Sequence, residues 1–174
     1  MDLKSICTLA FDIDSLQDFF CKTTTKGLSI QLPTLNVELL KLSGFCFQDK
    51  AGVSAFVRLL CKCPKLRSLE IKFQTVCDKW TNINKCMDEA SGQLIKLSSV
   101  LRKHKVLLFL KLRSFKGLRP QMHLIQEMLG WLPALEKVVI IGCPYVFDWN
   151  KEHETMEEIL QFPRASPKAK IVCK

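Results

Sequence analysis

The sequence lacks the features that mark membrane, secreted and nucleotide-binding proteins. Its longest apolar runs, VLLFL (106–110) and VVII (138–141), are far shorter than the roughly 20 residues needed to cross a bilayer. The first twenty residues carry four aspartates, whereas a secretory signal has a basic start and a longer apolar core. The seven glycines form neither a GxGxxG nor a GxxxxGK(S/T) phosphate-binding turn. We therefore expect a soluble protein of the nucleus or the cytoplasm, with no membrane contact, and not a secreted one.

Histidine is scarce, and the nine cysteines include no CxxC pair. A zinc site needs its ligands at short loop spacings, and His104, His123 and His153 show no such spacing to cysteine. We interpret the cysteines as reduced core residues, with metal binding as the alternative. No Ser/His/Asp or Cys/His arrangement stands at a motif spacing, and the adjacent Glu157 and Glu158 favour a solvated helix face over an acid–base pair. The sequence therefore predicts no enzymatic activity, no cofactor and no metal.

Acidic residues are missing from one stretch of the chain. The net charge is +9, and seven basic residues but no acid lie between Arg102 and Arg119. Such a stretch could bind an acidic protein, a nucleic acid or a phosphoinositide. Because no known nucleic-acid motif accompanies it, we rank a solvated face that keeps the domain soluble ahead of a nucleic-acid site.

One short pattern recurs along the chain: apolar, two variable residues, apolar, one variable residue, apolar. It predicts strands at 6–11, 37–42, 66–71, 107–112 and 135–140, with a partial sixth copy at 168–173 that would cap the structure. The sequence between these strands favours helices. Residues 55–71 match residues 124–140, since each segment has an apolar helical stripe, then a proline that cannot continue the helix, then the strand pattern. Further helices are expected within 94–101 and 152–160.

Alternating short strands and helices indicate an α/β fold with a parallel sheet and helices on one side. Because unit follows like unit, we expect a leucine-rich-repeat solenoid, with parallel strands on the concave side and full helices on the convex side. The alternative is an ordinary doubly wound α/β domain, although the phosphate-binding glycine turn is missing.

The second half of the chain resembles the FBD domain of plant F-box/LRR proteins. The matching segments are LKLRSFKG (110–117), the helix start at 122–125, EMLGWLPALEKVVI (127–140) and MEEILQFPRASPKAKI (156–171), in which Arg-Ala-Ser-Pro is the most specific. The chain departs from the family in having Gln121 where glutamate is frequent. The first half resembles the leucine-rich repeats that precede the FBD domain in those proteins. The resemblance implies a leucine-rich-repeat region over 1–104 and an FBD domain over 105–174 that continues and caps the same solenoid.

F-box/LRR proteins are substrate receptors of cullin-based ubiquitin ligases, in which the F-box binds a Skp-type adaptor and the repeats bind the target. The resemblance therefore implies a non-enzymatic interaction module that holds a target protein. Leu32-Pro33 imitates the start of an F-box, but residues 37–42 already fit the strand pattern. No F-box is visible, so a Skp-type adaptor is not expected as a partner. The alternatives are a nucleic-acid-binding protein that uses the basic stretch and a truncated, non-functional or dominant-negative F-box paralogue.

Side chains alternate across a strand, so the solenoid would direct every second strand residue towards the concave surface. The predicted target-binding residues are Lys41, Glu70, Lys72, Phe109, Lys111, Arg113, Lys137 and Val139. This mostly basic row suits an acidic segment of a target, with Phe109 as the expected anchor. The alternative, left open here, is a merely solvated row with Phe109 packed under a neighbouring loop.

Overall fold

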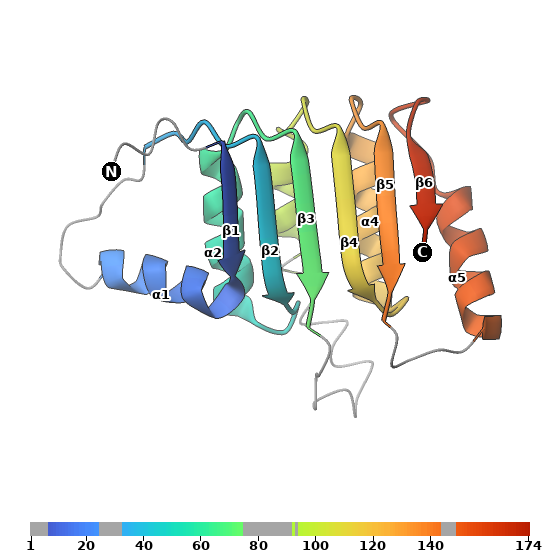
Figure 1. The fold of residues 1–174 in the computed structure, drawn as a ribbon, viewed down its shortest axis with the longest axis horizontal. Coiled ribbons are helices and arrows are strands. Elements are labelled where there is room, and N and C mark those ends of the chain that lie inside the picture. Colours follow the sequence, from blue (N-terminus) through green and yellow to red (C-terminus); the bar gives the residue numbers. More distant parts are fainter. Residues whose placement is uncertain (1–6, 25–32, 75–91, 93, 144–148) are drawn as a thin grey trace.

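The computed structural model describes residues 7–24, 33–74, 92, 94–143 and 149–174, which build a parallel sheet with helices behind it (Figure 1). The strands are β1 (Thr8–Asp12), β2 (Leu39–Phe45), β3 (Ser68–Phe73), β4 (Phe109–Phe115), β5 (Lys137–Gly142) and β6 (Lys170–Cys173). The labelled helices are α1 (Ile13–Thr24), α2 (Lys50–Lys62), α4 (Arg119–Trp131) and α5 (Trp149–Gln161), and residues 94–101 are also helical.

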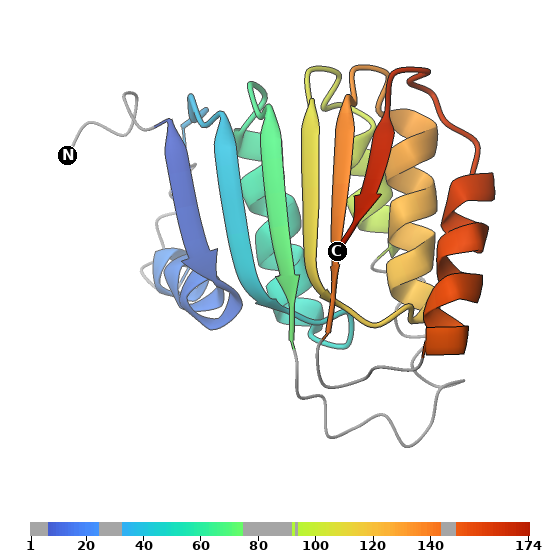
Figure 2. The same ribbon diagram turned by 45° about the vertical axis from the view of Figure 1, so that its right-hand side comes forward.

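The six strands lie in the order in which they follow one another along the chain, and each pair is parallel. A doubly wound sheet reverses its strand order at a switch point, so that alternative is wrong. Figures 1 and 2 show α2, α4 and α5 on the same side of the sheet. The opposite side carries no helix of the described part of the chain, and we call it the open face. The predicted α/β fold, with a parallel sheet and helices on one side, is confirmed.

Each strand begins two residues later than predicted, and for β2 to β5 the reason is that the first apolar residue of the pattern belongs to the preceding turn. Val37, Leu66, Leu107 and Leu135 hold this position and are fully buried. The backbone repeats as well. The Glu38 carbonyl accepts hydrogen bonds from the first strand residue of the next unit and from the residue before it, at 2.8–2.9 Å, and the same arrangement recurs from unit to unit. The turn before the strand therefore fixes the strand twice, through its buried apolar side chain and through the backbone carbonyl that follows it. An interpretation of the pattern as strand alone misses this role.

The inner face of the sheet supplies the core. Leu40, Leu69, Leu110 and Val138 stand in register and are at most 1% exposed. Burying side chains of this size contributes about 1.5–3 kcal/mol each. Alternation of side chains along a strand predicts that these four residues point inward. In the structure they belong to one core cluster with buried residues of α2 and α4.

Two strands carry a bulge near their C-terminal ends. The β2–β3 register shifts between Leu42 and Phe45, and the β4–β5 register shifts between Arg113 and Phe115. The inserted backbone turns left-handed at the residue before each phenylalanine, with φ 75° at Gly44 and φ 56° at Ser114. The extra residue turns the phenylalanines towards the core, where a cluster of rings closes the ends of the strands.

The helix ends follow local chemistry. The Asp49 carboxylate accepts a hydrogen bond from the Gly52 N–H at 3.0 Å and caps α2. Pro64 and Pro133 come directly after the C-terminal caps of α2 and α4, as predicted. The sequence indicated only a weak helix ahead of Leu32-Pro33 and did not give the bounds of α1, although the buried Leu16 and Phe20 have helical spacing. None of the helices within the described ranges is long and apolar enough to cross a membrane.

Candidate functional site

The sheet register gathers all eight predicted target-binding residues on the open face. Parallel pairing places equivalent residues of neighbouring strands side by side, about 4.8 Å apart. Three adjacent rows result: Phe109–Lys137, then Lys41–Glu70–Lys111–Val139, then Lys72–Arg113. Residues that lie up to about a hundred positions apart in the sequence thus form one continuous surface over β2 to β5.

The exposure of these side chains shows what the surface offers to a partner. Lys41, Lys72, Arg113 and Lys137 are exposed, while the three remaining members of the middle row are half-buried. Phe109 is 42% exposed, which is unusual for a phenylalanine. The described residues therefore leave the Phe109 ring accessible rather than packed under a loop, and its role as an anchor stays a prediction.

Glu70 is held by two cations of the neighbouring strand. Its Oε1 atom lies 3.6 Å from Lys111 Nζ and 3.4 Å from Arg113 Nη1. The Glu70 side chain is 15% exposed, whereas the side chains of Lys111 and Arg113 are 40% and 48% exposed. The acid is thus set into the face beneath basic groups that still reach solvent.

Strand β6 extends the open face by residues that the predicted set does not include. Lys170 is the register partner of Lys137, and Val172 is the register partner of Val139. Alternation along the strand would turn Ile171 and Cys173 to the other side, although Cys173 is exposed at this last strand. The face therefore gains one more cation and one more apolar side chain at its C-terminal edge.

The basic stretch from Arg102 to Arg119 is divided between two sides of the molecule. Two of its members lie on the open face, but Arg102 stacks over the Trp131 ring of α4, 3.7 Å from the ring centroid. Arg119 Nη1 lies 2.9 Å from Glu158 Oε1 of α5. These helix-side arginines join neighbouring elements, so the stretch does not form one continuous basic patch in the described structure.

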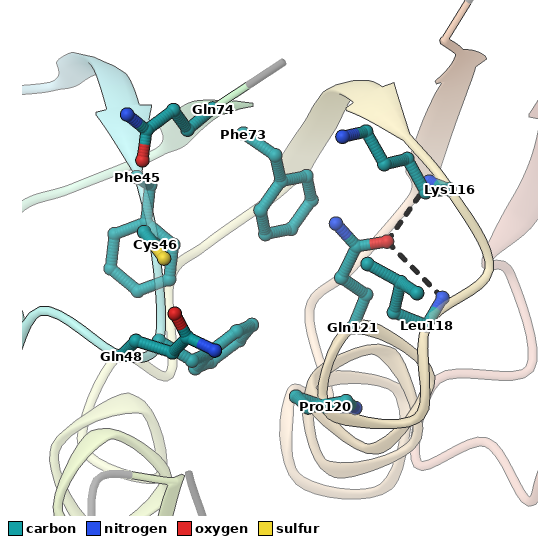
Figure 3. A pocket seen from close by; sticks show the side chains of 10 residues that line it. Phe45, Cys46, Gln48, Phe73, Gln74, Lys116, Leu118, Pro120 and Gln121 are labelled. Atoms are coloured by element: carbon teal, nitrogen blue, oxygen red, sulfur yellow. Dashed lines mark hydrogen bonds between the residues drawn. The ribbon is translucent and has the colours of Figure 1, made fainter. Parts of the chain in front are cut away.

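A pocket opens where β2, β3 and β4 end, beside the start of α4 (Figure 3). Its volume is about 410 Å³, which includes the space at its mouth, and phenylalanine rings form one of its walls. The Gln121 Oε1 atom accepts hydrogen bonds from the backbone N–H groups of Lys116 at 2.9 Å and Leu118 at 3.4 Å. The neutral Gln121 amide thus ties the β4–α4 turn without burying a charge. The described lining holds the Cys46 thiol and the Lys116 amine but neither histidine nor carboxylate.

His104 and Cys63 are buried titratable groups of the core, whereas Cys7, Cys61 and Cys173 are exposed, so the prediction that the cysteines are core residues is wrong for these three. His104 is 3% exposed and its imidazole hydrogen-bonds to the Leu60 backbone, while Nδ1 has no hydrogen-bond partner. Burial lowers the pKa of His104, and the bond to Leu60 opposes this shift. Burial raises the pKa of Cys63 to about 11, so its thiol is a poor nucleophile at neutral pH. Within the described ranges, no three histidine, cysteine or acidic residues gather into a group that could hold a metal.

Comparison with known proteins adds a relative from a plant. No protein-family model matches the chain, and no solved structure matches it. An F-box/FBD/LRR-repeat protein of Arabidopsis thaliana is 26% identical over 155 residues, which cover 85% of this chain and 35% of that protein. The chain thus spans about a third of the length of this relative. The resemblance of the chain to plant F-box/FBD/LRR-repeat proteins, first indicated by its own segments, is therefore confirmed.

Proposed function

We propose that the chain is a non-enzymatic interaction module that holds a target protein, in the manner of the substrate-recognition part of an SCF-type ubiquitin-ligase receptor. The observation that carries this proposal is the gathering of the eight predicted residues on the open face, which no helix of the described residues covers. The printed name of the Arabidopsis relative supports it, since that name contains F-box, FBD and LRR.

The finer architecture is proposed on the same basis. The sheet with helices on one side would be part of a leucine-rich-repeat solenoid, with repeats over 1–104 and an FBD domain over 105–174. Strand β3 pairs with β4 across this boundary as β2 pairs with β3. A continuous sheet supports an FBD domain that extends the solenoid rather than one that folds apart from it.

The chemistry of the open face favours an acidic target segment. Five of the eight residues are basic and one is acidic, and Phe109 and Val139 add apolar area. Basic groups on such a face raise the rate of encounter and select acidic partners. The exposed ring of Phe109, in the first row of the face, has the character of an affinity anchor.

Charge reversal on the open face tests the proposal. The variant Lys41→Glu/Lys111→Glu/Arg113→Glu should lose capture of the target from plant extract while its thermal unfolding stays close to that of the parent chain. The loss follows because an acidic segment would meet three repulsive charges instead of three attractive ones. The measurement is a tagged pull-down read by mass spectrometry, at low and moderate salt.

The matched control reverses three exposed lysines away from the open face: Lys50→Glu/Lys65→Glu/Lys96→Glu. Both triple variants lower the net charge from +9 to +3, since each reversal removes two charges. Capture that survives in the control and fails in the open-face variant supports the proposal. Equal capture by both variants would overturn it, and recovery of a Skp-type adaptor would show that the chain contains an F-box. Recovery of nucleic acid alone, lost at moderate salt, would favour the nucleic-acid alternative.

A further inference from the structure

Glu70 occupies the middle of the basic surface described above. It is the single acid among the eight predicted target-binding residues, and its register partners on both sides, Lys41 and Lys111, are cations. Arg113 approaches it from the next row of β4. A face that only had to attract acids would gain from a neutral residue at this position, so the carboxylate calls for an explanation.

We infer that Glu70 determines the specificity of the open face by setting how acidic a target segment must be to engage Lys111 and Arg113. The inference rests on the proposed function and names the class of ligand, an extended acidic peptide. In the free protein, Glu70 occupies the two cations and lowers the positive potential of the face. A segment with a lone carboxylate gains little by competing with it, whereas several adjacent carboxylates together can draw both cations away.

The geometry makes this exchange feasible. Ion pairs near the surface contribute only about 0–1 kcal/mol, so Lys111 and Arg113 can change partner at low cost. Their side chains are 40% and 48% exposed and can swing towards a ligand, while Glu70 is 15% exposed and stays set into the face. After the exchange the Glu70 carboxylate faces the ligand with fewer of its own partners. Breaking the two ion pairs of Glu70 costs the same for every ligand, and only a segment with several carboxylates gains enough from Lys111 and Arg113 to offset that cost.

The width of the face sets the length of the peptide. Six strands at a spacing of about 4.8 Å span roughly 24 Å, and an extended chain of about eight residues has that length. A peptide that crosses the strands over the middle row passes Lys41, Lys111 and Val139, with Phe109 beside it. An acidic segment with one apolar residue matches this order of groups.

The test measures binding of a fluorescein-labelled poly-glutamate peptide of about eight residues, by fluorescence anisotropy, to the parent chain and to Glu70→Gln. The variant keeps the shape of the side chain, and circular dichroism checks its fold. We expect the peptide to bind Glu70→Gln about fivefold more tightly, with a steeper salt dependence. The matched control is Glu154→Gln on α5, which raises the net charge by the same amount away from the open face and should leave the affinity unchanged.

Each outcome bears on one of the two proposals. Unchanged or weaker binding by Glu70→Gln, while the open-face triple variant still loses the peptide, overturns the role of Glu70 and leaves the proposed function standing. Equal binding of the peptide by the parent chain and by the open-face triple variant overturns the proposed function itself. An equal gain in Glu154→Gln would show that net charge alone decides, against the inference. Tighter binding of an oligouridylate of the same length than of the peptide would overturn the peptide as the ligand class.

Discussion

A buried imidazole destabilises the fold when it takes up a proton. His104 lies 3% exposed in the turn before β4, and burial lowers its pKa below the ordinary value of about 6.5. The unfolded chain therefore binds this proton more readily than the folded chain. His104 contributes stability that is fully present above pH 6.5 and is lost as the pH falls below it. The limiting slope for one proton is about 1.4 kcal/mol per pH unit.

We predict that urea unfolding of the parent chain shows a lower free energy of unfolding at pH 5.5 than at pH 7.5, and that His104→Gln removes most of this difference. His123→Gln is the matched control, because His123 is exposed on α4. The assignment to His104 would be refuted by a His104→Gln variant with the pH dependence of the parent chain.

At the scale of the element, the two bulges pose the same backbone problem with different residues. Ser114 adopts φ 56° in β4, where Gly44 adopts φ 75° in β2. A left-handed conformation costs an L-residue roughly 1–2 kcal/mol, and glycine avoids this cost but loses more chain entropy on folding. The serine in β4 therefore carries strain that the glycine in β2 does not.

We expect Ser114→Gly to raise the free energy of unfolding by about 0.5 kcal/mol, the net of the two effects. The reciprocal change Gly44→Ser should lower it by more than 1 kcal/mol, since it adds roughly that strain and a Cβ atom there would also lie 3.2 Å from Ile13 Cγ2. Denaturant titration of both variants gives the answer. A destabilised Ser114→Gly together with a neutral Gly44→Ser would contradict this account of the bulges.

The sequence could predict the strands and helix ends that are marked by a repeated residue pattern. The apolar pattern located every strand, and the prolines located the ends of α2 and α4, because both depend on local composition. The two-residue offset at each strand start could not be predicted, since a buried turn leucine and a buried strand leucine look alike in sequence. The bulges arise from pairing between strands, which the pattern of a single strand does not show.

For the molecule as a whole, the sequence could predict which residues of the candidate site share a face, because side chains alternate along each strand. All eight residues lie on the open face because the register of a parallel sheet copies the spacing of the pattern. The ion pairs of Glu70 and the separation of Arg102 and Arg119 from the face depend on side-chain positions in three dimensions. The sequence shows residues 102–119 as one basic stretch, but the fold places some of these residues on the open face and others beside the helices.

Strand β6 pairs with β5, and its removal should destabilise the neighbouring units. Backbone bonds tie it in at both ends, from the Lys170 N–H to the Glu136 carbonyl and from the Lys174 N–H to the Ile140 carbonyl, at 2.9 Å each. The Ala165 N–H also donates to the Leu129 carbonyl at the end of α4, at 2.8 Å. Without β6, the buried side chains of β5 would lie at an uncapped sheet edge, which favours association.

Truncation of residues 162–174 should therefore lower the free energy of unfolding by roughly 2–4 kcal/mol, the range of severe single-site defects, and promote aggregation. The substitution pair Lys168→Ala/Lys174→Ala serves as the control, since it removes two exposed charges of the same segment and keeps the strand. Thermal unfolding and size-exclusion chromatography measure the two effects. A truncated chain that stays monomeric, with the melting temperature of the control, would mean that β5 can close the sheet alone. Strand β6 would then be an additional strand and not a cap, because its loss would not destabilise the chain by exposing the buried side chains of β5.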